Sequence, residues 1–144
     1  MSAGLGLRER KKIERRRRIE AAAIDLFEAE GFDGVTVDDI AARAEISPRT
    51  FFHYFATKED VVLGDYADRL DRIVAELGRR SDAEGGWAAL RAAFVVVASD
   101  YTTRRDELVR RFRIVADNPS VYARSLQLQA GWEATLTDAL ARRR

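Results

Sequence analysis

The feature that most constrains the fold of this chain is a pair of helix-start signals placed close together. Ser47-Pro48 combines a hydroxyl N-cap with a proline at the first helical position, where the missing N–H breaks no hydrogen bond. Thr57 followed by Asp60 offers a second cap. The segment between the two signals can therefore form only a helix of roughly two turns, about 12 Å long at about 1.5 Å per residue.

Two further helices are predicted upstream of this short segment. Apolar residues at i, i+4, i+7 and i+8 mark one face of the first: Ile19, Ala23, Leu26 and Phe27. Gly31 suits the left-handed position after a helix, and Phe32 can then pack against Phe27. Thr36 with Asp39 forms a capping pair for a second helix. The apolar face of that helix is Val37, Ile40, Ala41 and Ala44.

Aromatic residues crowd into the short helix at positions 51, 52, 54 and 55, with the chain's only histidine among them. Phe51 and Phe55 share a face at i and i+4, so we expect both to be buried. The opposite side must face something else, and it carries Arg49, Thr50, Phe52, His53 and Tyr54. Two short helices joined by a tight turn make a helix-turn-helix, whose second helix fits a DNA major groove. Packing of Phe52 and Tyr54 against neighbouring helices is the alternative.

Composition excludes several classes of site. No cysteine is present, which excludes disulfides, thiolate zinc sites and a cysteine nucleophile. A single histidine leaves little scope for metal or triad chemistry, and no acid–base or nucleophile constellation stands out. No apolar run approaches the roughly 20 residues of a membrane span, and residues 1–6 do not form a signal sequence. We therefore expect a soluble cytoplasmic protein that is not an enzyme and uses no metal or cofactor.

Charge is distributed unevenly, although the net formal charge is only +1. Residues 8–18 contain eight basic and two acidic side chains, whereas residues 19–63 contain three basic and ten acidic ones. Positive charge focused on one N-terminal arm favours a polyanionic partner. A disordered, solubilising tail is the alternative.

Helical periodicity continues beyond Thr57. One longer helix is predicted from Thr57, with a stripe formed by Val62, Tyr66, Leu70, Ile73 and Leu77. A loop with the sequence SDAEGGW separates it from the next stripes, which are Trp87, Leu90, Phe94, Val97 and Tyr101, then Leu108, Phe112 and Val115. Asn118-Pro119 begins a last helix, which bears Tyr122, Leu126, Trp132, Leu136 and Leu140. Such stripes are typical of a helical core.

Four motifs occur in order between residues 13 and 63: L-F-x-x-x-G-F at a helix end, T-V-x-x-I-A, S-x-x-T-F-F-x-Y-F and x-x-K-E. Together they resemble the DNA-binding domain of the tetracycline-repressor (TetR) family of transcriptional regulators. The stretches GLRERKK and FATKEDVVLGDY are more narrowly similar to members of that family with an acyl-CoA-like ligand-binding C-terminal domain.

The resemblance implies roles for individual residues of the head. Arg49 is implied for guanine readout, Phe52 for contact with a thymine methyl group, and His53 for a groove-facing position. Backbone contacts are implied for Thr36, Ser47, Thr50, Tyr54 and Lys58, and contacts with neighbouring phosphates or with the minor groove for the basic arm, including Arg15 and Arg16. Thr36 and Thr57 could instead serve only as helix caps.

Glu45 departs from the family, which usually has glycine in the turn. A left-handed conformation would strain a non-glycine residue by about 1 kcal/mol. The negative charge would also lie close to the DNA side and lower the affinity.

For residues 64–144 the resemblance implies a helical ligand-binding and dimerisation domain. The residues predicted to line its pocket are Phe112, Tyr122 and Trp132, for a small hydrophobic or acyl-CoA-like effector, with ordinary core contacts as the alternative. Family members dimerise through two final helices, whereas this chain stops at Arg144. We therefore expect the domain to be incomplete, or to dimerise differently, with an exposed hydrophobic surface.

The predicted fold is all-α, in three parts. A basic N-terminal arm (1–18) leads into the first helix, a helix-turn-helix DNA-binding head covers residues 13–63, and a helical regulatory domain covers residues 64–144. The predicted function is a ligand-responsive transcriptional regulator, a repressor that binds a pseudopalindromic operator as a homodimer and is released by a small-molecule effector. An all-helical protein–protein adaptor without sequence-specific DNA binding is the alternative.

Overall fold

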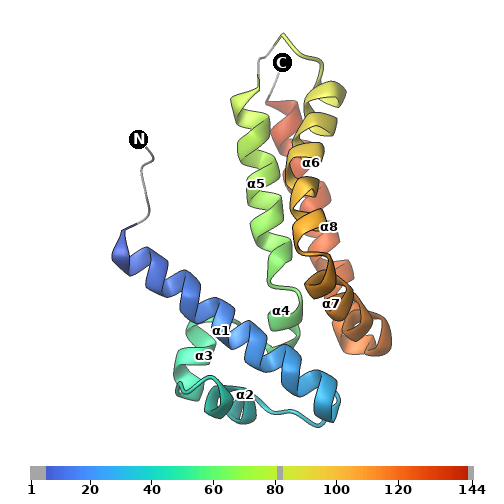
Figure 1. The fold of residues 1–144 in the computed structure, drawn as a ribbon. Coiled ribbons are helices and arrows are strands. Elements are labelled where there is room, and N and C mark those ends of the chain that lie inside the picture. The colour runs from blue at the N-terminus through green and yellow to red at the C-terminus, as the bar shows by residue number, and fades with distance from the viewer. Residues whose placement is uncertain (1–5, 81–82, 143–144) are drawn as a thin grey trace. The chain divides into compact units, whose positions relative to one another are not determined.

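The computed structural model describes residues 6–80 and 83–142, and every regular element in these ranges is an α-helix (Figure 1). The all-α prediction is therefore confirmed. The helices are α1 (Leu7–Glu30), α2 (Val37–Arg43), α3 (Pro48–Tyr54), α4 (Lys58–Val62), α5 (Asp65–Arg79), α6 (Gly86–Thr103), α7 (Arg105–Asp117) and α8 (Pro119–Ala141). Among the described residues, no helix combines the length and apolar character needed to cross a membrane.

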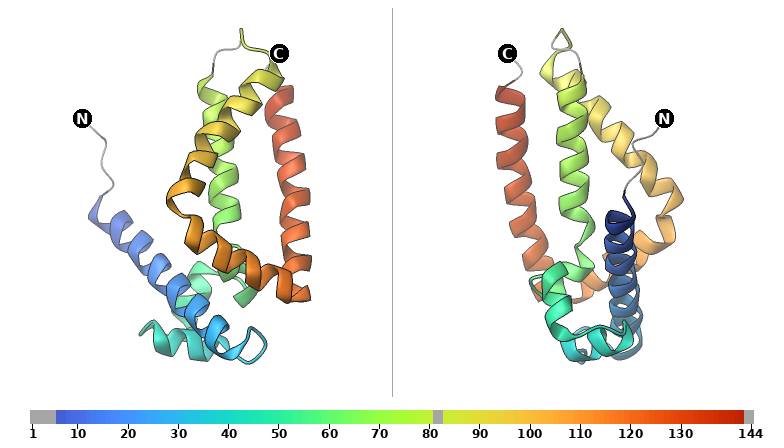
Figure 2. Two further views of the ribbon diagram at one scale, coloured as in Figure 1. Left: turned by 45° about the vertical axis from the view of Figure 1, so that its right-hand side comes forward. Right: turned by 90° about the vertical axis from the view of Figure 1, so that its left-hand side faces the viewer.

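The chain divides into two compact units, Met1–Val62 and Leu63–Arg144, which we describe separately. In the first unit α1 packs against α2 and α4, and α2 packs against α3. The largest side chains that these contacts bury completely are Phe51, Ile19, Ile40, Val35 and Val61. This core holds the two short helices α2 and α3 in a fixed arrangement against the longer α1 (Figure 2).

The end of α1 follows the sequence prediction. Gly31 has a φ of 84°, a conformation that glycine adopts more readily than other residues. Its N–H donates a hydrogen bond to the carbonyl of Phe27 at 2.9 Å. Phe32 turns back so that its ring centroid lies 4.7 Å from that of Phe27. The predicted glycine end and its aromatic contact are therefore confirmed.

The start of α1 lies earlier than the sequence suggested. The helix begins at Leu7, directly after Gly6, so residues 7–18 of the predicted arm are helical. The alternative of a disordered tail is therefore wrong for these residues. Residues 1–5 of the arm lie outside the described part. Arginine, lysine and glutamate have high helix propensities, and no proline or glycine interrupts them. The first fully buried residue of α1 is Ile19. The basic residues therefore form a helical extension of α1, residues 7–18, whose N-terminal part projects beyond the other helices of this unit (Figure 1).

The single long helix predicted from Thr57 is wrong. The structure has α4 and α5 instead, separated by a turn at Leu63 and Gly64. The N–H of Tyr66 donates to the carbonyl of Leu63 at 2.9 Å, three residues back, which tightens the chain at that point. Glycine is a poor helix former, and the continuous apolar stripe concealed its effect.

The second unit forms a helical bundle in which α5 packs against α6 and α8, and α7 packs against α8 (Figure 2). One cluster of its buried core consists of Ile73, Leu77, Ala89, Ala93, Val97 and Ala139. Leu90, Trp132, Leu136 and Leu140 pack against this core and are partly buried. The predicted stripe of α5 is confirmed at Ile73 and Leu77.

The predicted stripes of α6, α7 and α8 are wrong at several large residues. Trp87 is 73% exposed, and exposure is also substantial for Phe94, Phe112, Tyr122 and Leu126. The buried face of α6 includes Val97, as predicted, but it otherwise uses the small residues Ala89 and Ala93, which let neighbouring helices approach closely. Apolar residues occur almost all round α6, so periodicity alone could not select its inner face. The side chain of Tyr101 lies outside the described residues.

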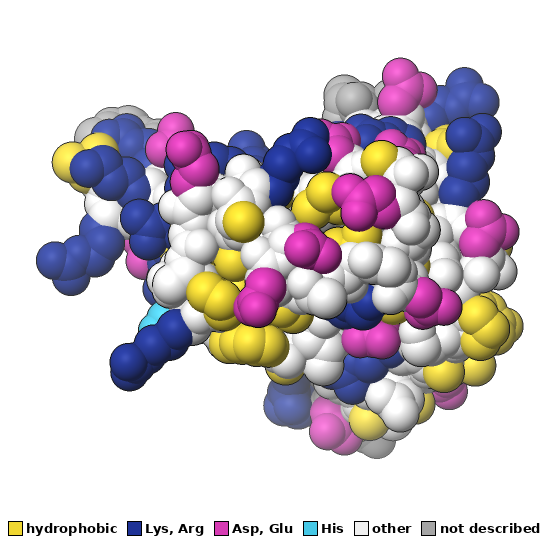
Figure 3. Space-filling model, turned by 90° about the horizontal axis from the view of Figure 1, so that it is seen from below, with side chains coloured by type: hydrophobic (Ala, Val, Ile, Leu, Met, Phe, Trp, Pro, Cys, Tyr) yellow, Lys and Arg dark blue, Asp and Glu magenta, His cyan; other side chains and the backbone are white. Residues whose placement is uncertain are grey.

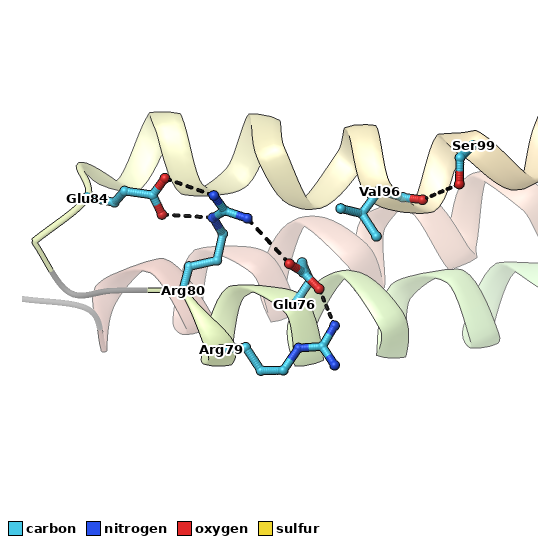
Figure 4. A network of polar contacts seen from close by, with 6 residues as sticks. All are labelled: Glu76, Arg79, Arg80, Glu84, Val96 and Ser99. Atoms are coloured by element: carbon cyan, nitrogen blue, oxygen red, sulfur yellow. Dashed lines mark hydrogen bonds and ion pairs between the residues drawn. The ribbon is translucent and has the colours of Figure 1, made fainter. Parts of the chain in front are cut away.

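An ion-pair network closes the end of α5 (Figure 4). Arg80 donates to both carboxylate oxygens of Glu84, at 2.8 and 3.1 Å, and also contacts Glu76 at 3.4 Å. Arg79 donates to Glu76 as well, and this hydrogen bond holds the pKa of the Glu76 carboxyl below its ordinary value. The network links α5 to the residues that precede α6.

Candidate nucleic-acid interface

Helix α3 begins at the cap that the sequence predicted. The Ser47 hydroxyl oxygen accepts a hydrogen bond from the Thr50 N–H at 3.0 Å, and Pro48 occupies the first helical position. The two hydroxyls also lie 3.0 Å apart, within hydrogen-bonding distance. These contacts fix the first turn of α3 and hold both hydroxyls at its start.

The two faces of α3 differ as predicted. Phe51 and Phe55 are buried, with ring centroids 5.6 Å apart, so the predicted buried face is confirmed. Phe52 is 53% exposed and meets Phe51 edge-on at 5.3 Å. Arg49 and His53 are also exposed. Figure 3 shows the histidine side chain (cyan) at the surface beside an extended cationic side chain.

Thr50 and Tyr54 lie half-buried at the edges of that outward face. The outward face therefore presents a guanidinium, an imidazole and an apolar ring over two helical turns. A guanidinium can donate to a guanine edge, and an apolar ring can contact a thymine methyl group.

Helix α2 is fixed by a complete capping box. The Thr36 hydroxyl accepts from the Asp39 N–H at 3.1 Å, and the Thr36 N–H donates to the Asp39 carboxylate at 3.0 Å. The predicted capping pair is confirmed. Because the hydroxyl oxygen accepts this bond, its own hydrogen can still be donated outward, to an anion at the surface.

The turn between α2 and α3 contains the strained residue that the sequence predicted. Glu45 has a φ of 61°, and no other described non-glycine residue has a positive φ. Its N–H donates to the carbonyl of Ala42 at 3.2 Å, and the N–H of Ile46 donates to that of Ala41 at 2.9 Å. The expectation of a left-handed glutamate is therefore confirmed.

Lys58 is held by contacts within the head. Its ammonium donates to the carbonyls of Phe32 at 2.7 Å and Val35 at 2.8 Å, both in the loop between α1 and α2. The same group lies 4.3 Å from the centroid of the Phe32 ring. The predicted phosphate contact of Lys58 stays a prediction, but these internal contacts were missed. They join residues more than twenty positions apart, and no sequence pattern could reveal them.

The predicted contacts from the basic arm fall into two environments. Arg15 is exposed on the helical extension. Arg16 is instead half-buried, 3.4 Å from the Glu20 carboxylate and with its guanidinium carbon 5.2 Å from the centroid of the Phe55 ring. Arg16 therefore ties α1 to the end of α3.

The three residues predicted to line an effector pocket differ in their surroundings. Trp132 packs on the core of the second unit. Its ring centroid lies 6.0 Å from the ring centroid of Tyr66 and 6.5 Å from that of Phe94. Phe112 and Tyr122 are 48% and 54% exposed. Within the described ranges, no group of three or more acidic or histidine side chains is arranged to hold a metal ion.

Comparison with known proteins identifies relatives of this chain. The family described as "Bacterial regulatory proteins, tetR family" matches residues 19–64. MftR of Mycobacterium tuberculosis, named as a transcriptional regulator of mycofactocin biosynthesis, is 34% identical over 125 residues, which cover 87% of this chain and 63% of that protein. TcmR of Streptomyces glaucescens, an HTH-type transcriptional regulator, is 32% identical over 148 residues, which cover 97% and 65%.

One solved structure similar to this chain is that of FadR from Thermus thermophilus, a TetR-family transcriptional repressor in complex with lauroyl-CoA. It is 30% identical, with coverage of 87% of this chain and 60% of that chain and a TM-score of 0.47. The chain spans less than two thirds of the length of the curated relatives that it matches, at 63% and 65%. The helix-turn-helix head of this chain therefore matches the tetR family of bacterial regulatory proteins over residues 19–64, and the longer matches are to proteins named as transcriptional regulators.

Proposed function

We propose that this protein is a DNA-binding transcriptional regulator that reads operator DNA with the outward face of α3. The observation that carries the proposal is the division of α3 into two faces. Phe51 and Phe55 anchor the helix in the core, which leaves Arg49, Phe52 and His53 outside. A short helix anchored in this way can enter a major groove without loss of its fold.

Base readout is assigned to three side chains of that face. Arg49 lies in the first turn of α3, where a guanidinium can donate to both acceptors of a guanine edge. Phe52, one turn later, offers an apolar ring to a thymine methyl group, and His53 lies beside it.

Phosphate contacts are assigned to hydroxyl groups at the edge of the reading face and to the helical extension. The hydroxyls are those of Thr36, Ser47, Thr50 and Tyr54. The extension supplies Arg15 and its exposed neighbours, whose contribution depends on salt and not on sequence.

Regulation is assigned to the second unit. We propose a repressor that binds a pseudopalindromic operator as a homodimer and leaves it when a small hydrophobic or acyl-CoA-like effector binds. Such an effector must have a higher affinity for a conformation in which the two recognition helices no longer match successive major grooves. Trp132 with its aromatic neighbours Tyr66 and Phe94 is the cluster that we assign to effector contacts. The alternative of a protein–protein adaptor gains no support from the relatives, which are named as transcriptional regulators.

The test is DNA binding by the wild type and by Arg49→Ala. Fluorescence anisotropy with duplexes from the DNA flanking its own gene should reveal a site that the wild type prefers over random DNA. Arg49→Ala should then cost about 1–3 kcal/mol on that site and flatten the preference at one base position. Arg43→Ala is the matched control, because Arg43 is also exposed but lies on α2, 3.9 Å from the Asp25 carboxylate.

Two results would count against the proposal. No preference for any flanking duplex by the wild type would contradict sequence-specific binding. Equal losses for Arg49→Ala on the preferred site and on random DNA would make Arg49 a phosphate contact and not a base reader.

A further inference from the structure

The ammonium of Lys58 has two acceptors inside the head. Lys58 is the first residue of α4, and its side chain reaches back to the loop that joins α1 to α2. It donates to the Phe32 carbonyl at 2.7 Å and to the Val35 carbonyl at 2.8 Å. An ammonium carries three hydrogens, so two of them are committed to this loop.

The position of the ammonium is further restricted by an aromatic ring. It lies 4.3 Å from the centroid of the Phe32 ring, a favourable cation–π distance. Phe32 is itself buried and packs on Phe27. The ammonium of Lys58 is therefore held by the two loop carbonyls and by the ring of Phe32, which is itself fixed by its packing.

The loop that Lys58 holds contains two glycines, Gly31 and Gly34, whose backbone freedom contacts from elsewhere can restrict. Gly31 has a positive φ, and a Cβ built at Gly34 would lie 3.0 Å from the Glu30 carbonyl oxygen. Val35, the second acceptor, immediately precedes Thr36, the N-cap of α2. A hydrogen bond to the Val35 carbonyl thus fixes the peptide that leads into the Thr36 hydroxyl.

We propose that Lys58 is a positioning residue, which supports DNA binding through Thr36 and not through a phosphate contact of its own. The inference rests on the proposed DNA-binding function. The two hydrogen bonds from Lys58 to the loop carbonyls hold the loop in the position in which the Thr36 hydroxyl can contact a phosphate. The positive charge of Lys58 is used inside the head, where it offsets the partial negative charges of two carbonyl oxygens.

The first test separates positioning from phosphate contact by salt dependence. Operator affinity is measured by fluorescence anisotropy over a series of salt concentrations for the wild type and Lys58→Met, which keeps an apolar stem but loses both bonds. Measurements are made at a temperature at which circular dichroism shows both proteins folded. We expect affinity to fall about tenfold, with an unchanged slope of log K against log salt. A slope shallower by about 0.9 would mean that Lys58 neutralises a phosphate directly and would overturn the proposal.

The second test asks whether the effect passes through Thr36. In a double-mutant cycle, Lys58→Met should cost about tenfold in the wild-type background and less than about twofold in a Thr36→Ala background. Equal costs in the two backgrounds would show that Lys58 acts independently of Thr36, contrary to the proposal.

Lys58→Arg guards against the case in which Lys58→Met does not fold. Arginine keeps the positive charge and can donate hydrogen bonds, but its guanidinium is larger and planar, so it does not fit the place of the compact ammonium between the two carbonyls and the Phe32 ring. We expect Lys58→Arg to lose affinity too, whereas wild-type affinity would show that charge alone matters and would reject the positioning role. Failure of the proposed function has a different signature, since the wild type itself would then select no operator.

Discussion

At the scale of single residues, Glu45 is where the head carries strain. Its φ of 61° places the residue in the left-handed region of backbone conformation, which costs a non-glycine residue about 1–2 kcal/mol. The side chain is exposed, and it is acidic in a turn that directly precedes the proposed reading helix. Glu45 therefore combines a local cost in stability with a charge that opposes an anionic partner.

Glu45→Gly should relieve the strain and raise operator affinity. Part of the relief is offset by the greater freedom of glycine in the unfolded chain, so we expect a gain in unfolding free energy of about 1 kcal/mol or less. Glu45→Ala is the matched control, because it removes the charge but keeps the Cβ. It should raise affinity without the gain in thermal stability. Equal melting temperatures for the two variants would show that the turn stores no such strain.

At the scale of elements, α3 has one face for stability and one for binding. Phe55→Ala should lower the unfolding free energy by on the order of 3 kcal/mol or more, because it opens a cavity and removes the ring beneath Arg16. His53→Ala should leave thermal stability almost unchanged and weaken DNA binding, since His53 is exposed. Thermal unfolding and anisotropy on the same preparations check both. The reverse pattern would mean that the two faces have been assigned the wrong way round.

The helical extension of α1 is the second element with a separable role. Deletion of residues 1–12 removes four of the eight cations between positions 8 and 18 and leaves the buried part of α1, which starts at Ile19. Operator and nonspecific affinity should fall together, and the salt dependence should become shallower by about 0.9 per lost phosphate contact. The fold should persist, which circular dichroism checks.

The deletion also has a sharp counter-outcome. The remainder of the head, residues 19–63, is net acidic, with ten acidic and three basic side chains, so it offers little other positive charge. An unchanged salt slope after the deletion would therefore show that the extension is only a solvated helix.

At the scale of the whole molecule, binding to two half-sites requires two recognition helices at a fixed separation. Half-sites for such pairs lie one helical turn, about 34–36 Å, apart or a multiple of it. Insertion of five base pairs between the half-sites turns one of them to the opposite side of the duplex, so affinity should fall at least about tenfold. Insertion of a full turn is the control for added length alone. A chain that binds each half-site independently would tolerate both insertions equally.

Local chemistry alone determined much of the head. The caps at Thr36 and Ser47 and the glycine end at Gly31 follow from hydrogen bonds and backbone preferences within three or four residues, which any reader of the sequence can evaluate. The buried pair on α3 follows from helical spacing. The strained conformation of Glu45 came from the resemblance to a turn that normally holds glycine, and the backbone confirms it.

Tertiary structure decided the rest, because those features depend on distant partners. Helix α6 could have buried Trp87 and Phe94, but neighbouring helices close on Ala89 and Ala93. The sequence indicated that Lys58 and Arg16 were cations free to contact phosphates. In the fold, Lys58 donates to two loop carbonyls, and Arg16 lies over an aromatic ring. Contacts of this kind are set by which surfaces meet in space, and helical periodicity carries no information about the partner.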